Sequence, residues 1–344
     1  MAGVKIGVNV RFKNPEPWAR GWDVVYREHL DYAAAVDRLG FDAVWVPEHH
    51  CVPSGYNPAP FAALAAISQV TKRCWIGTQP LLLPLYNPVM AAEQAAVIDV
   101  LSGGRLILGV GAGYRNGDFE ALGFEKRDRG ALTEETLTVL LKALRDQKPF
   151  DHAGRFYNLK GVDLFPKPVR PGGPEVQLAV RSPPAARRAV KHGVSVNLHS
   201  REAARTHGPI VAEGVAAKGV DPANIGVGLL RLAFLAPTVE AGHAAVAPYM
   251  AYDAKEYDDW QTPDDPDDRR LIEARRTAGA KPGGLFTGAE LADAILGDAA
   301  AIAEIGLRLD WVNLSLWPPG MPLAEALDCL ERVAAEVLPK VQAR

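Results

Sequence analysis

The chain has 344 residues, of which 48% are hydrophobic and 23% are charged, a composition typical of a globular protein. Its formal net charge of -3 gives no electrostatic reason to expect nucleic acid or an anionic membrane as a partner. The three cysteines are scattered and form no Cys-x-x-Cys pair, which disfavours a disulfide framework or a thiolate metal site. The sequence has neither an export-signal pattern nor a membrane-spanning apolar run, so we expect a cytoplasmic protein.

Strand-like and helix-like segments alternate along almost the whole chain. The strand-like segments are apolar nearly throughout, which is typical of parallel strands buried on both faces. We expect strands to start near residues 4, 41, 75, 105, 176, 194, 225 and 311. Apolar residues at three-and-four spacing predict helices at 24–39, 58–70, 88–101, 132–145, 185–192, 202–218, 239–255, 288–296, 299–305 and 323–338.

Two stretches interrupt this alternation. Residues 148–174 contain short β-like pieces at 154–159 and 163–169, which we interpret as an insertion hairpin crossing a barrel end. Residues 254–284 have few large apolar side chains and many Asp, Pro and Gly, so they are the best candidate for a mobile excursion. A solvated surface loop and a lid over a ligand are both open interpretations of that excursion.

Eight parallel, helix-linked strands predict a (β/α)8 barrel formed by residues 1–344 as a single domain. In such barrels the active site lies at the C-terminal ends of the strands. An open doubly wound sheet would require a Gly-x-Gly-x-x-Gly turn after the first strand, and residues 8–11 read Val-Asn-Val-Arg instead. The residues directly after each strand are therefore the candidates for a functional site.

The second strand runs directly into Glu48, His49 and His50. Histidine suits acid/base work near neutral pH because its ordinary pKa is about 6.5. A metal site is less convincing, since adjacent residues of an extended chain point to opposite sides and no partner motif is present elsewhere. A hydrogen-bonded structural histidine is the remaining alternative at this stage.

The third and fourth strands end in residues suited to a flat ligand. Gln79-Pro80 places a proline inside a strand, which indicates either a cis bond in an irregular backbone or a trans proline at a strand terminus. The fourth strand ends in small residues that include Gly111 and Ala112, and these let a planar ligand or another backbone approach closely.

The fifth strand ends in Arg181-Ser182, followed by a helix. Ser182 is placed as the residue that caps the helix, and Pro183 as its first residue. A helix N-terminus preceded by arginine favours a phosphate, although ordinary capping explains the serine equally well.

Four ordered motifs carry a family resemblance. They are GFDAVWVPEHH at 40–50, IGTQPLLLPLYNPV at 76–89, LSGGRLILGVGAGY at 101–114 with DFEALG at 118–123, and FPKPV at 165–169. Together they resemble the bacterial luciferase-like flavin-dependent monooxygenase family along most of the chain. The resemblance implies a TIM barrel that binds reduced FMN, or in a sister branch the deazaflavin F420, at its mouth.

The resemblance also implies roles for individual residues. His49 takes the position of the active-site acid/base, with Glu48 and His50 as its supports. The implied cofactor-binding residues are Asn9, Gln79, Pro80, Gly111, Ala112, Arg181 and Ser182. The chain departs from the family in three places: the residue pair at 79–80 is usually small and non-prolyl, Ala112 replaces an arginine, and Arg181 stands where luciferases have an acidic residue before the serine. Either Arg181 compensates for that arginine, or the cofactor is F420.

The leading hypothesis is a flavin-dependent monooxygenase that uses reduced FMN, supplied by a separate reductase, and O₂ to oxidise a small organic substrate. An F420-dependent hydride-transfer oxidoreductase is the first alternative, with Arg187, Arg188 and Lys191 available for a longer phosphorylated tail. A non-catalytic flavin-binding protein is the second. The family often dimerises through the helices beside the second and third strands, so the resemblance implies a homodimer.

Overall fold

Eight parallel strands close into a barrel in the computed structural model, which describes residues 3–260 and 284–342. The order around the barrel is β1-β12-β9-β8-β7-β4-β3-β2, so that β1 pairs with both β2 and β12. The barrel strands are β1 (Lys5–Asn9), β2 (Ala43–Val46), β3 (Trp75–Leu82), β4 (Leu106–Gly111), β7 (Glu175–Ala179), β8 (Ser195–Asn197), β9 (Gly226–Leu232) and β12 (Arg308–Ser315). The predicted (β/α)8 barrel is confirmed.

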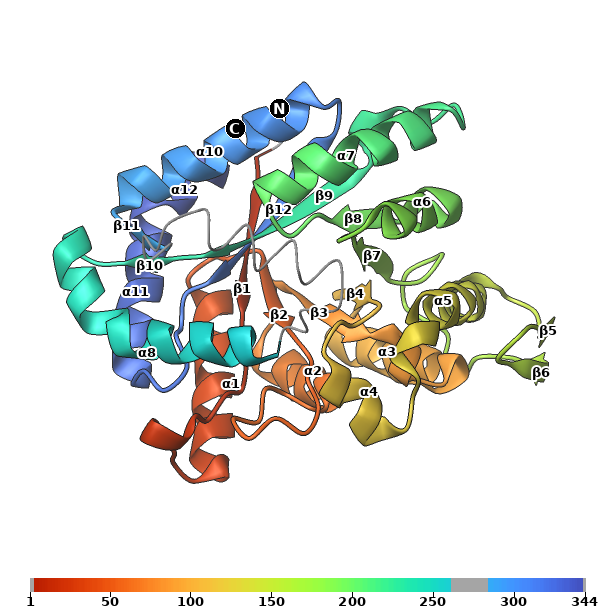
Figure 1. Ribbon diagram of the computed structural model, residues 1–344, viewed down its shortest axis with the longest axis horizontal. Helices are drawn as coiled ribbons and strands as arrows, with labels where there is room; N and C mark the ends of the chain where they lie inside the picture. Colours follow the sequence, from red (N-terminus) through yellow and green to blue (C-terminus); the bar gives the residue numbers. More distant parts are fainter. Residues whose placement is uncertain (1–2, 261–283, 343–344) are drawn as a thin grey trace.

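The α-helices lie around the outside of the strands (Figure 1). They are α1 (Trp22–Arg38), α2 (Pro60–Val70), α3 (Pro88–Ser102), α4 (Asn116–Leu122), α5 (Arg129–Arg145), α6 (Pro183–His192), α7 (Arg201–Ala216), α8 (Val239–Asp259), α10 (Gly288–Glu304), α11 (Leu323–Glu336) and α12 (Leu338–Gln342). Single 3₁₀ turns occur at Glu16–Trp18, Leu83–Leu85, Lys126–Asp128 and Pro222–Asn224. None of the helices within the described residues is long and apolar enough to cross a membrane.

Helix α3 illustrates how the sequence sets an element's ends. The side chain of Asn87 accepts hydrogen bonds from the N–H groups of Val89 and Met90, and Pro88 occupies the first turn. Gly103 ends the helix in the left-handed conformation, with φ of 69°. Helices α4, α10 and α12 differ from expectation: α4 was not predicted, α10 is one helix where two were expected, and the helix predicted at 323–338 is α11, followed by the separate, unpredicted α12.

The barrel interior is filled by a small cluster of its own, made of Ala43, Trp45, Ile107 and Trp311. The two indoles meet edge to face, with ring centroids 5.5 Å apart. Gly77 lies beside Trp45, where a larger residue would not fit: a Cβ at position 77 would lie 2.5 Å from Cζ3 of the indole. The larger apolar core lies between the strands and the surrounding helices. The barrel is therefore packed below its mouth and open to chemistry only at its ends.

An antiparallel hairpin, β5 (Phe150–Ala153) and β6 (Asn158–Val162), follows α5. Its strands lie a few residues before the pieces expected at 154–159 and 163–169. The carboxylate of Glu135 on α5 accepts from the N–H groups of Phe156 and Tyr157, and the Lys142 ammonium lies over the Phe150 ring. The hairpin therefore packs along α5, at the outer edge of the molecule in Figure 1, and does not cross a barrel end as expected.

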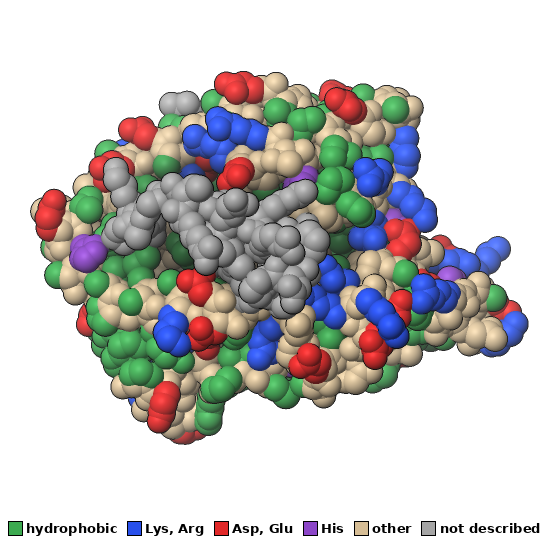
Figure 2. All heavy atoms as spheres, viewed as in Figure 1, with side chains coloured by type: hydrophobic (Ala, Val, Ile, Leu, Met, Phe, Trp, Pro, Cys, Tyr) green, Lys and Arg blue, Asp and Glu red, His purple; other side chains and the backbone are tan. Residues whose placement is uncertain are grey.

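The region of the expected excursion at 254–284 is only partly described. Residues 254–259 are the last residues of α8, and residues 261–283 lie outside the described part of the chain. The strand expected at 225–235 is β9 followed by β10 (Phe234–Leu235), which pairs in parallel with β11 (Leu285–Phe286). In the face shown in Figure 2, basic and acidic side chains are interspersed over the coloured surface.

Candidate active site at the barrel mouth

Glu48, two residues after β2, is buried and connects the ends of β2 and β3. Its Oε2 accepts a hydrogen bond from the N–H of Leu82 at 2.6 Å. Its Oε1 accepts from the Tyr86 hydroxyl at 2.5 Å and lies 2.7 Å from Nε2 of His50. Glu48 is 1% exposed, so these contacts are the compensation for its buried carboxylate.

His50 is held by Glu48 and its pKa is raised. Burial alone would lower the pKa of this imidazole, but the hydrogen bond and the charge of Glu48 outweigh that effect. Because Glu48 holds the side chain and Asp118 receives the backbone N–H at 2.9 Å, His50 is fixed from two directions. Both residues therefore support the geometry of the loop that carries His49.

His49 is paired with Asp118, the first residue of the DFEALG motif. The His49 Nδ1 lies 2.9 Å from Oδ2 of Asp118, while Oδ1 accepts from Nη1 of Arg115 at 2.9 Å. Burial raises the pKa of the Asp118 carboxyl, but the contacts with His49, the His50 N–H and Arg115 together hold it below its usual value. The ionised carboxylate orients the imidazole, so that Nδ1 carries a proton and Nε2 is left to exchange one.

Aromatic rings from three separate segments surround His49. Tyr56, Tyr114 and Trp260 have ring centroids 4.8, 5.7 and 4.7 Å from the imidazole, respectively. Burial raises the pKa of Tyr56 to about 12, which keeps its hydroxyl neutral at physiological pH. His49 itself is 6% exposed, so proton transfer there would occur in a largely water-excluded setting.

The break in β3 forms one wall of the mouth. The Gln79–Pro80 bond is cis, one of the two alternatives left open by the sequence, and the register with β4 shifts between Thr78 and Leu81. A Cβ at Gly111 would lie 3.0 Å from the Pro80 ring, so glycine leaves this wall flat. Gln79 Oε1 is buried without a hydrogen-bond partner among the described residues.

Arg181 and Ser182 lie at the start of α6. Ser182 occupies the capping position, yet its side chain makes no capping hydrogen bond, which leaves the hydroxyl available. The Arg181 guanidinium lies over the Tyr114 ring at 4.8 Å, and Tyr114 in turn contacts His49. Tyr114 therefore lies between Arg181 and His49, two residues of the predicted site. Ala112, one residue beyond β4, is half-buried.

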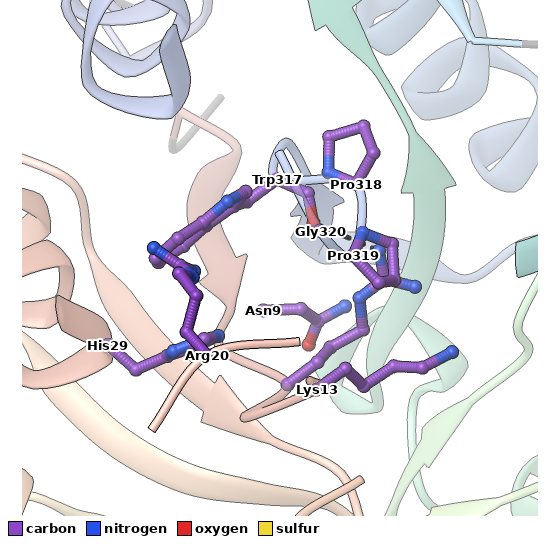
Figure 3. Close-up of a pocket in the computed structure, with 9 residues that line it drawn as sticks. Asn9, Lys13, Arg20, His29, Trp317, Pro318, Pro319 and Gly320 are labelled. Atoms are coloured by element: carbon purple, nitrogen blue, oxygen red, sulfur yellow. Dashed lines mark hydrogen bonds between the residues drawn. The ribbon is translucent and has the colours of Figure 1, made fainter. Parts of the chain in front are cut away.

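Asn9 belongs to a small crevice on the β1 and β12 side of the mouth (Figure 3). Its Oδ1 is buried without a partner among the described residues. His29 in the same crevice is stacked between Phe12 and Trp317, at 5.0 and 4.2 Å. Burial, together with Arg20 and Arg11, lowers the pKa of His29 to about 4, so this imidazole is neutral at physiological pH.

Within residues 3–260 and 284–342, no three His, Cys, Asp or Glu side chains are grouped so that they could hold a metal ion. Glu48 and His50 face each other, whereas His49 turns to Asp118. The two imidazole rings therefore have separate carboxylate partners, although Asp118 also accepts from the His50 backbone N–H.

Comparison with known proteins decides the family. A profile of luciferase-like monooxygenases matches residues 4–304. The chain belongs to the luciferase-like monooxygenase family. The family's members are flavin- or F420-dependent oxidoreductases, and the homologues include FMN- and F420-dependent proteins.

The chain spans about half the length of the curated relatives that it matches. The oxygenase component of flavin-dependent trigonelline monooxygenase from Acinetobacter baylyi is 27% identical over 176 residues, which are 51% of this chain and 48% of that protein. F420-dependent glucose-6-phosphate dehydrogenase from Amycolatopsis mediterranei is 31% identical over 164 residues, or 44% of this chain and 49% of that protein. Among solved structures, monooxygenase RslO1 from Streptomyces bottropensis has a TM-score of 0.80 at 21% identity, covering 98% of this chain and 99% of that one.

Sequence reasoning missed two groups of residues at the mouth. Asp118 belongs to one of the family motifs but was assigned no role, and Arg115 was not considered. A signal for Asp118 existed, since an acidic residue shortly after the glycine-rich end of β4 lies at the same barrel end as His49. The second group, Arg11 and Lys13 with their acidic partners on α8, gave no local signal because the partners lie more than 200 positions away.

Proposed function

We propose that this chain is the oxygenase component of a two-component flavin monooxygenase. It would take reduced FMN from a separate reductase and use O₂ to oxidise a small organic substrate. The observation that carries the proposal is the buried pair of His49 and the ionised Asp118, which supplies a proton-exchanging imidazole of defined orientation at the barrel mouth. The monooxygenases of the family use flavin reductase partners and O₂, which agrees with this assignment.

The residues of the mouth fit a flat heterocycle with polar edges. Gly111 and Pro80 offer a flat wall, and the buried oxygens of Gln79 and Asn9 lack partners among the described residues, as expected where a ligand's N–H groups complete them. Arg181 with the N-terminus of α6 would hold the phosphate. When bound, the reduced cofactor supplies two electrons to O₂, and one oxygen atom enters the substrate while the other leaves as water.

The chain's own residues would have separable tasks in that reaction. Asp118 keeps the His49 ring in one tautomer, so that Nε2 can give or take a proton at the reacting edge. Glu48 and His50 fix the backbone of the same loop, and the surrounding aromatic rings exclude water.

Two of the three basic side chains that could bind the phosphorylated tail of F420 already form ion pairs within the protein. Arg188 Nε and Lys191 Nζ lie 3.0 and 2.6 Å from the carboxylate of Glu134 on α5. These contacts favour FMN, whose single phosphate needs only Arg181 and the start of α6. Anaerobic titration with photoreduced FMN and, separately, with reduced F420 tests this: we expect tight one-to-one binding of FMN, weakened severalfold by Arg181→Ala. Tighter binding of F420 would transfer the assignment to the hydride-transfer branch.

We further infer a homodimer that buries one face of α3. Met90, Val97 and Leu101 on this helix are 58%, 42% and 48% exposed, an unusual accumulation of large apolar side chains on one surface helix. Sedimentation velocity checks the inference: wild type should sediment as a dimer and Val97→Glu as a monomer. Val239→Glu, at a similarly exposed valine on α8, is the control that should remain dimeric. A monomeric wild type would contradict the inference.

A further inference from the structure

The C-terminal half of α8 is attached to the barrel by charges as well as by aromatic rings. Across the helix's 21 residues, Gly242, Val246 and Asp253 are buried. Val246 anchors the first half by apolar packing, whereas the buried residue of the second half is a carboxylate, beside which Tyr252 and Tyr257 pack on Trp18 and Tyr56. Figure 1 shows this second half turned toward the barrel centre.

The anchoring carboxylates meet two cations that follow β1. Asp253 accepts from Nη1 of Arg11 at 2.6 Å and from Nζ of Lys13 at 2.6 Å, and Glu256 also accepts from Lys13. Arg11 is fixed in turn, because its Nη2 donates to the backbone oxygen of Trp317 at 3.0 Å. We call Arg11, Lys13, Asp253 and Glu256 the β1–α8 quartet.

The quartet is almost completely removed from solvent. Its side chains are 8%, 1%, 12% and 11% exposed in that order, and its two positive and two negative charges balance. Burial would raise the pKa of Asp253, but Arg11 and Lys13 lower it below its usual value. A buried charge without its partner is strongly unfavourable, so a displacement of α8 that separated the quartet would be costly.

The same helix face carries the ring that covers His49. Positions 253, 256, 257 and 260 follow the three-and-four spacing of one face. The Trp260 ring centroid lies 4.7 Å from that of His49 and 5.0 Å from that of Tyr257. The Lys13 ammonium lies 5.9 Å from the centroid of the Trp260 ring, so the quartet and the covering ring are immediate neighbours.

We propose that Asp253 and Glu256 are positioning residues, whose ion pairs with Arg11 and Lys13 hold the Trp260 indole against His49. The indole then forms a wall of the compartment in which the imidazole works. The placement of Trp260 is independent of any activity, whereas its consequence for turnover rests on the proposed function. The two parts are therefore tested by different readouts.

The first readout is the accessibility of Trp260 to acrylamide. Subtracting the fluorescence of Trp260→Phe from that of the parent isolates this one indole among the seven tryptophans. In the Asp253→Asn background, we expect the quenching constant of the Trp260 component to rise severalfold. Asp259→Asn is the matched control, since it removes a carboxylate of the same helix whose ion pair, within the part of the chain that the structure describes, is with the exposed Lys255. It should leave the component unchanged.

A second variant covers the case in which Asp253→Asn does not fold. Glu256→Gln removes the other carboxylate that accepts from Lys13, so it should give the same increase in smaller measure. If Glu256→Gln leaves Trp260 as protected as in wild type, and Asp253→Asn does the same where it folds, the positioning role is refuted.

The activity readout separates this inference from the proposed function. Asp253→Asn should raise the KM for the organic substrate while the affinity for reduced FMN stays within twofold of wild type. Failure of wild type to bind reduced FMN would refute the proposed function and leave the fluorescence result intact. An unchanged KM together with an exposed Trp260 would refute the indole's role as a wall of the compartment.

Discussion

Replacing Asp118 by asparagine should be among the most damaging near-isosteric changes at the mouth. The carboxylate is fully buried and accepts from Arg115 and the His50 N–H while it orients His49. An asparagine retains one oxygen, but its amide would donate to Nδ1 of His49 and so favour the opposite tautomer. It also leaves Arg115 without a charged partner at this position.

The cost follows from the contacts that are lost. A hydrogen bond to a charged group contributes roughly 1.5–3 kcal/mol, and an uncompensated buried charge adds to the loss. We therefore expect Asp118→Asn to lower the free energy of unfolding by about 3 kcal/mol in urea denaturation at pH 7. Turnover should fall on the order of 100-fold, the contribution typical of a well-placed acid/base.

Asp128→Asn provides the matched control. Asp128 pairs at 2.7 Å with Arg155, and the two side chains are 30% and 64% exposed. Exposed pairs contribute little, so the control should change the free energy of unfolding by about 0.5 kcal/mol or less. If Asp118→Asn costs no more than Asp128→Asn, the reasoning from its buried contacts is refuted.

Other variants test separate parts of the structure. The pKa of His29 is about 4 in the folded state and about 6.5 in the unfolded state. The stabilisation from the neutral imidazole is therefore complete above pH 6.5 and is lost as the pH falls toward 4, by roughly 3 kcal/mol. His29→Phe should reduce this loss in urea titrations, and pH profiles identical to those of wild type would contradict the prediction. Gly77→Ala would place a Cβ 2.6 Å from the Ile107 carbonyl oxygen and should cost about 1–3 kcal/mol in thermal or urea unfolding, whereas Gly130→Ala, with only one atom within 4 Å at 3.9 Å, should cost none. Tyr86→Phe removes a donor to the buried Glu48 and should cost about 1–2 kcal/mol; a neutral result would show that Glu48 does not need that hydroxyl.

The barrel could be predicted because its signals are local. Strands such as β2 and β4 are continuous apolar runs, and the intervening helices carry their own periodicity and caps. Once the strands were predicted, the residues that follow them could be placed at one end of the barrel, since parallel strands have their C-terminal ends together. Glu48, His49 and His50 were found in this way.

The partners of those residues could not be predicted from spacing. His49 and Asp118 are 69 positions apart, and Arg11 and Asp253 are 242 apart. Their contact depends on how far each loop turns back over the mouth, which is decided by packing and not by local propensity. The hairpin at β5 and β6 shows the same limit, because its strands were expected but the surface of α5 that receives it was not.

The central claim is that His49 does proton transfer on a reduced flavin bound at this mouth. The most direct measurement mixes the anaerobic complex of protein and photoreduced FMN with O₂ and substrate in a stopped-flow instrument, for wild type and His49→Ala. His152→Ala is the control, because His152 lies in β5 of the hairpin, where it contacts Glu135 of α5. We predict that all three bind reduced FMN similarly and that only His49→Ala loses turnover, on the order of 100-fold. Equal turnover rates for wild type and His49→Ala would contradict the account, whereas binding of reduced FMN with no turnover in any of the three would favour a non-catalytic flavin-binding protein.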